Sequence, residues 1–137
     1  MANITLEQAQ AVVVAALREG RALGLRPLSV AVLDTGGHLV AFAREDASSN
    51  LRPQIAIAKA SGALALGVSS RSIGEMAVER PTFINAAASL APGGIIPAAG
   101  GLLIHSEGAT IGAVGVTGDL SDNDEKCAAA GIAAIGP

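Results

Sequence analysis

The sequence predicts an α+β domain in which a central antiparallel sheet is flanked by helices. Residues 28–42 contain two apolar runs joined by Asp34-Thr35-Gly36-Gly37. Asp bonds nearby backbone and Gly supplies positive φ, so this pattern is typical of a β-hairpin. A similar pattern at residues 102–117 surrounds Ser106-Glu107-Gly108. Apolar residues at helical spacing occur before, between and after the two hairpins, and this order favours one antiparallel sheet with helices packed on it.

Five helices are predicted from apolar spacing bounded by capping residues, Gly or Pro. Thr5 and Gln8 form a capping box at the first helix. Gly67 ends the second helix, Ser69 or Ser70 caps the third, and Ser121 caps the last. The predicted spans are residues 6 to 20 or 24, 54–66, 70–79, 82–89 and 121–135. No linker interrupts them, so we expect residues 1–137 to form a single domain.

The composition argues for assembly and against some partners. Hydrophobic residues make up 50% of the chain, but aromatic residues only 1%. Because small side chains bury little area each, we expect a monomer to expose apolar surface and a homo-oligomer, from dimer to octamer, to cover it. The net charge of −3 and the lack of stacking aromatics argue against binding to nucleic acid.

Membrane insertion and secretion are not expected either. Residues 81–104 carry no charge, but three prolines and paired glycines interrupt them, so they do not predict a spanning helix. The first ten residues lack a basic region followed by an apolar one. The single cysteine, Cys127, fits a reducing compartment. We therefore expect the protein in the cytoplasm.

A glycine-rich segment at residues 91–101 is the first candidate for a binding site. Backbone can approach a ligand closely at Gly93, Gly94, Gly100 and Gly101. Lys59 lies in an otherwise apolar helix, where it either meets an anion or extends its ammonium group to the surface.

Arg44, at the end of the first hairpin, has two interpretations as well. Its guanidinium either clamps a carboxylate or pairs with Glu45 or Asp46 at the surface. We expect the glycine-rich segment to lie over the sheet near Lys59 and Arg44, at the edge of an oligomer interface. There the two cations would hold one carboxylate of a small anionic ligand.

Metal-ligand candidates are few. His38 and His105 each lie in a hairpin, and either imidazole is suited to a metal or to haem iron, although isolated histidines are more often structural or exposed. Cys127 lies in an Ala-rich helix, where a buried, inert thiol is expected. The residues alone predict no reaction, so whether the protein is an enzyme stays open.

Several motifs together resemble one family. They are AVLDTGGHLVAFARED, Ile57-Ala58-Lys59-Ala60, Gly93-Gly94, Gly100-Gly101, IGAVGVTG and Asp124-Glu125 followed by Ala128. In this order the chain resembles the GlcG/HbpS-like proteins, which include the C-terminal domain of PduO-type proteins. The resemblance implies a profilin-like fold, assembly into dimers or octamers, and haem or tetrapyrrole binding in some members, with haem degradation in one branch.

Three functions remain open at this point. The first is binding of haem or a related tetrapyrrole, with His38, His105 or a site hydroxyl as the axial ligand. The second is an enzyme or binding protein for a small carboxylic acid in a catabolic pathway, with Lys59 and Arg44 as the cations. The third is an accessory oligomer without a ligand. Fold alone does not decide among them.

Overall fold

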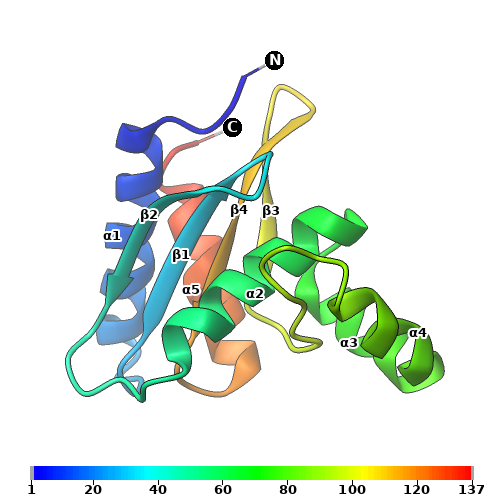
Figure 1. Ribbon diagram of the computed structural model, residues 1–137. Coiled ribbons are helices and arrows are strands. Elements are labelled where there is room, and N and C mark those ends of the chain that lie inside the picture. The colour runs from blue at the N-terminus through cyan, green and yellow to red at the C-terminus, as the bar shows by residue number, and fades with distance from the viewer. Residues whose placement is uncertain (1, 137) are drawn as a thin grey trace.

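A computed structural model describes residues 2–136 and confirms the α+β class (Figure 1). A four-stranded antiparallel sheet has the order β2-β1-β4-β3. The two predicted hairpins are therefore neighbours, joined through β1 and β4. The elements are α1 (Leu6–Ala22), β1 (Ser29–Asp34), β2 (Leu39–Arg44), α2 (Arg52–Leu66), α3 (Ser70–Glu79), α4 (Pro81–Ala88), β3 (Gly101–Ser106), β4 (Ala109–Thr117) and α5 (Ser121–Ala133).

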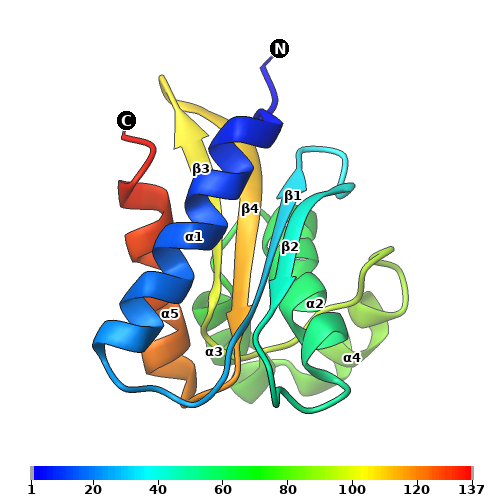
Figure 2. The same ribbon diagram turned by 90° about the vertical axis from the view of Figure 1, so that its left-hand side faces the viewer.

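Helices cover both faces of the sheet. Figure 2 shows α1 and α5 side by side on one face, with α2 on the other. Val30, Val32, Val114 and Val116 point to the first face, because residues two apart on a strand share a face. They pack with α1 and α5 into the main core, which also contains Ile104.

The face against α2 is lined by small residues, and this explains much of the Ala and Gly content. A Cβ at Gly115 would lie 1.9 Å from the carbonyl oxygen of Ala56, so only glycine lets α2 come this close to β4. Ala60 and Ala113 pack beside this contact with Leu33. Because α2 lies so close to the sheet, small side chains are enough to fill the space between them.

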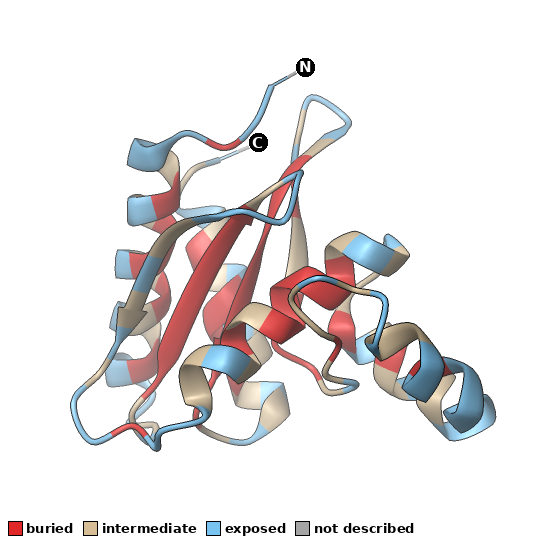
Figure 3. Cartoon of the chain, in the orientation of Figure 1, coloured by how far each residue is buried: buried red, intermediate tan, exposed pale blue. Residues whose placement is uncertain are grey.

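A separate wing, α3 with α4, extends from the end of α2 (Figure 1). Its cluster consists of Ile73, Ile84 and Ile95 and is distinct from the main core. Pro81 ends α3 and also occupies the first turn of α4, where its missing N–H costs no helical hydrogen bond. Figure 3 shows that α4 is mostly exposed or half-buried, whereas β1 and β4 are buried.

Most local predictions are confirmed, with one exception at α5. Thr5 and Gln8 form the capping box, Gly67 is left-handed at φ 72°, and Ser69 caps α3. The last helix has Leu120 at its N-cap and Ser121 inside the first turn, so the prediction of a Ser121 cap is wrong. No helix in residues 2–136 is long and apolar enough to cross a membrane.

Candidate functional site

Lys59 lies inside the protein and already has a carboxylate partner. Its side chain is 3% exposed, so the surface interpretation is wrong. The ammonium Nζ donates to the carbonyl oxygen of Val116 at 2.9 Å and lies 3.2 Å from Oδ2 of Asp124. Asp124 is 1% exposed. The anion that meets this buried cation is thus a side chain of the same protein.

The pair sits in a low-dielectric environment that disfavours both charges. Burial lowers the pKa of Lys59, while the attraction of Asp124 opposes that change. Burial raises the pKa of Asp124, again against the attraction of its partner. Asp124 also accepts the backbone N–H of Asp119 at 3.0 Å. Nothing local in the sequence predicts this pair, because Lys59 and Asp124 are 65 residues apart along the chain.

The glycine-rich segment packs against α2 through backbone contacts. A Cβ at Gly100 would lie 2.8 Å from Nζ of Lys59, and one at Gly101 would lie 2.3 Å from its carbonyl oxygen. The N–H of Gly101 donates to the Ser70 hydroxyl at 2.7 Å. Gly100 and Gly101 thus close over Lys59 instead of leaving room for a ligand.

Gly93 and Gly94 form a turn at the tip of the same segment. The N–H of Gly93 donates to the Ser61 hydroxyl at 3.2 Å, and that of Gly94 to the Ala91 carbonyl at 3.0 Å. Gly94 has φ 87°, which favours glycine. These N–H groups already have partners within the protein, although both glycines line small hollows, so ligand binding at Gly93 and Gly94 stays a prediction.

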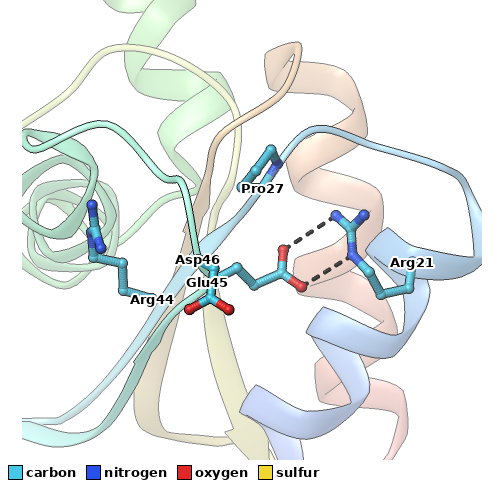
Figure 4. Close-up of a pocket in the computed structure, with 5 residues that line it drawn as sticks. All are labelled: Arg21, Pro27, Arg44, Glu45 and Asp46. Atoms are coloured by element: carbon cyan, nitrogen blue, oxygen red, sulfur yellow. Dashed lines mark hydrogen bonds and ion pairs between the residues drawn. The ribbon is translucent and has the colours of Figure 1, made fainter.

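Arg44 lies apart from the Lys59 pair. Its guanidinium donates to the carbonyl oxygen of Ser48. Figure 4 shows that it points away from Arg21 and Glu45, which form an ion pair at 3.0 Å. The expected pairing of Arg44 with Glu45 or Asp46 is therefore wrong. The structure does not bring Arg44 and Lys59 to one ligand, because each has its own partners.

A row of polar side chains crosses the end of the sheet next to Arg44. Ser29 on β1 is paired with Arg44 on one side and with Thr117 on the other, and directly paired residues share a face. Arg52, the first residue of α2, donates to the Thr117 hydroxyl at 2.7 Å. The hydroxyl of Ser29 is buried and has no hydrogen-bond partner among residues 2–136. Sequence reasoning missed Ser29, Arg52 and Thr117, since nothing local joins them.

Three hollows surround the turn at residues 92–94, two of them mainly apolar and the smallest of mixed polarity. The largest has a volume of about 440 Å³ and lies between α2 and α4. Two smaller hollows, of about 160 and 290 Å³, share lining residues with it. The Arg80 guanidinium lies 4.1 Å from the ring centre of Phe83, one of the lining side chains. The large hollow is lined by Ala65, Leu66, Phe83, Ala86, Ala87, Leu90, Ala91, Pro92 and Ile95.

Of the two histidines, His38 is better placed to bind a metal ion or haem iron. Its side chain is 79% exposed, and Nδ1 lies 3.1 Å from Oδ1 of Asp34. The same carboxylate accepts the backbone N–H groups of His38 and Gly36, and the bond from His38 is the main reason that the pKa of Asp34 is lowered. An ionised carboxylate accepts hydrogen bonds, so Nδ1 is the nitrogen that donates to Asp34, and Nε2 is the nitrogen through which the neutral imidazole would bind a metal.

His105 has a weaker partner. Its Nδ1 lies 3.3 Å from the Thr110 hydroxyl, which does not fix the tautomer. Across residues 2–136, no cluster of three or more His, Cys, Asp or Glu side chains is placed to hold a metal ion. Cys127 is buried, and burial raises the pKa of its thiol to about 11, as expected for an inert cysteine.

Comparison with solved structures gives strong matches over the whole chain. A double mutant of HbpS from Streptomyces reticuli superposes with a TM-score of 0.88 at 29% identity, covering 100% of this chain and 90% of that one. Klebsiella pneumoniae protein ORFY gives 0.87 at 25% identity, with coverages of 98% and 91%. A PduOC:haem complex gives 0.86 at 21% identity, with coverages of 98% and 96%.

Sequence comparison supplies the family. No curated protein matches this chain significantly. A family model described as "Haem degrading protein HbpS-like" matches residues 4–133. This range holds both hairpins, all five helices and the Lys59–Asp124 pair. The chain therefore belongs to the HbpS-like family of haem-degrading proteins.

Proposed function

We propose that the protein binds haem or a related tetrapyrrole in the apolar hollow between α2 and α4, with His38 as the ligand of the iron. The family description supports the ligand class. The observation that carries the assignment of His38 is its exposed imidazole, which the Asp34 carboxylate holds through Nδ1 so that Nε2 is the nitrogen turned to a ligand. Bound haem would supply an iron centre able to bind oxygen and to change oxidation state.

The side chains of the hollow fit a tetrapyrrole. Its lining is almost entirely apolar, as the faces of a porphyrin require. Phe83 offers an aromatic face, and the Arg80 guanidinium beside it supplies positive charge for a propionate. The small hollow beside it reaches from Ala65 and Pro92 to the β1–β2 turn at Gly36. His38 follows that turn directly, so the iron ligand and the apolar hollow lie on the same side of the molecule.

Assembly into a homo-oligomer is part of this proposal. Leu90 and Val78 on the wing are both 83% exposed, and Phe83 is 44% exposed. On the opposite side, α1 and β2 expose Val14 and Leu39. Exposed apolar side chains of this kind are typical of interfaces between subunits. Light scattering that gives a monomer mass at micromolar concentration would contradict the oligomer.

A haem titration tests the binding proposal. We expect hemin to produce a Soret band with the parent protein and a shifted, weaker band with His38→Ala. His105→Ala is the matched control and should keep the parent spectrum. Asp34→Asn should weaken binding without removing the imidazole, because the orienting carboxylate is lost.

A second variant tests the hollow itself. Ala87 lines it, so Ala87→Trp should fill the space and exclude the porphyrin while His38 stays in place. Equal hemin affinity in the parent, His38→Ala and Ala87→Trp proteins would refute both the ligand and the hollow.

A further inference from the structure

We propose a second binding site, for a small oxyanion with two negative charges, between Arg44 and Arg52 at the end of the sheet remote from His38. Arg44 ends β2 and Ser29 begins β1, whereas His38 lies beyond the other end of these strands. Five residue steps along a strand separate the two ends by roughly 17 Å. A ligand at this site is therefore distinct from one held by His38.

The two guanidinium groups approach the site from different elements. Arg44 reaches it from β2 and bonds the Ser48 carbonyl, and the chain then runs a short way to Arg52. The N–H of Arg52 donates to the Ser49 carbonyl at 3.1 Å, and its guanidinium bonds Thr117 on β4. Ser29 is paired with both Arg44 and Thr117 in the sheet. These contacts therefore link Arg44 to Arg52 in two ways, through the loop after β2 and across the strands.

Neither guanidinium is neutralised by the protein. In the described part of the chain, Arg44 and Arg52 form no ion pair with a carboxylate. Asp46, which follows the end of β2 and lines a hollow with Arg44, forms no ion pair in the described residues, and the other nearby carboxylates already have partners. Glu45 pairs with Arg21, Asp119 pairs with Arg26, and Asp124 pairs with Lys59. Arg44 and Arg52, on either side of the short segment that joins β2 to α2, thus each carry a positive charge that no ion pair in the described residues neutralises, and an anion bound between them would be attracted to both.

A buried hydroxyl without a partner is the independent sign of a ligand. Ser29 is 0% exposed, and its Oγ has no hydrogen-bond partner in the described residues. Buried hydroxyls are normally bonded, and leaving one unpaired is costly. Its side chain shares the face on which Arg44 and Thr117 lie. An oxyanion oxygen between the arginines would accept the Ser29 proton. The first N–H groups of α2, which no side chain caps in the described residues, carry partial positive charge that would also attract the anion.

The chemistry of the groups defines the ligand class. A guanidinium presents planar pairs of N–H donors that match the oxygens of a carboxylate or a phosphate. Two such groups match a ligand with two charges, either a small dicarboxylate or inorganic phosphate. Separate titrations distinguish these two sources of the same oxyanion chemistry.

Calorimetric titration with malonate and with inorganic phosphate at low salt tests the site. We expect one of the two to bind the parent protein, and Arg44→Ala and Arg52→Ala each to weaken binding at least tenfold. Arg52→Lys keeps the charge but loses the planar pair of N–H donors, so it should give an intermediate affinity. Arg18→Ala removes the same charge from the outer face of α1 and should bind like the parent.

Ser29→Ala separates ligand binding from a structural role. We expect it to weaken anion binding several-fold while the unliganded protein remains as stable as the parent or becomes more stable. His38→Ala should bind the anion normally, so failure of the haem proposal leaves this site unaffected. Absence of binding by both anions would overturn the proposal. Equal losses in Arg18→Ala and Arg52→Ala would also overturn it, because they would indicate attraction to overall charge.

Discussion

Replacing Lys59 by Met should strongly destabilise the protein. The change keeps most of the side-chain volume but removes the ammonium that compensates Asp124. Asp124 is 1% exposed and would keep only the N–H of Asp119 as a partner among the bonds described here. Breaking a buried ion pair from one side costs about 3–5 kcal/mol. This is a large fraction of the ~5–15 kcal/mol that stabilises a typical domain.

The pH dependence of the stability of Lys59→Met is a second, independent test of the buried pair. Without Lys59, the attraction that holds down the pKa of Asp124 is gone, while the burial that raises it remains. A raised pKa means that the folded protein binds a proton more readily than the unfolded chain. The stability of Lys59→Met should therefore fall as pH rises through the folded-state pKa of Asp124 and recover as pH is lowered.

Urea unfolding followed by circular dichroism measures both effects. The control is Lys126→Met, since Lys126 is the other lysine of the chain and is exposed on α5. We expect no more than about 0.5 kcal/mol of change for this surface control. In a double-mutant cycle, Lys59→Met with Asp124→Ala should cost less than the sum of the two single changes. A loss below about 1 kcal/mol for Lys59→Met at neutral pH would refute the reasoning, since a broken buried pair costs several times more.

Three further predictions concern other parts of the molecule. Gly115→Ala should prevent stable folding, because its Cβ would meet the Ala56 carbonyl oxygen at 1.9 Å; a soluble variant with the parent's unfolding midpoint would contradict the close packing of α2. Cys127 should resist thiol reagents at pH 8 and react fully in denaturant, since burial raises its pKa to about 11. Hydrogen bonds, chiefly from the Asn123 side chain, hold the pKa of Asp119 below its ordinary 3.8. Stability from Asp119 is therefore present above pH 3.8 and lost as pH falls below it, and an acid titration of Asp119→Asn should show a weaker loss.

Features that depend on neighbours in the chain could be predicted from the sequence. The capping box joins Thr5 to Gln8 across three residues, and the left-handed Gly67 bonds the Ala63 carbonyl four residues earlier. The hairpin turn after β1 similarly depends on Asp34 and the residues that follow it. Such interactions are encoded within one turn of chain, so propensity and spacing are enough to find them.

Features that join distant segments could not be predicted in this way. Lys59 finds Asp124 only because α2 and α5 both approach the end of β4. The row of Ser29, Arg44 and Thr117 exists because three strands are in register. Gly100 and Gly101 illustrate a different limit. A glycine that permits close approach looks the same in sequence whether a ligand or a helix approaches, and here the helix does.

The separate hydrophobic cluster of the wing has a consequence for dynamics. Ile73, Ile84 and Ile95 hold α3, α4 and the loop together without sharing the main core. Units of this kind open at lower free energy than the global unfolding reaction. Amide hydrogens of α4 should therefore exchange with solvent faster than those of β1 and β4, through local opening that leaves the sheet intact. The hollow proposed for the tetrapyrrole lies between this wing and α2, so a bound ligand should slow amide exchange selectively in α4 and couple the order of α4 to binding.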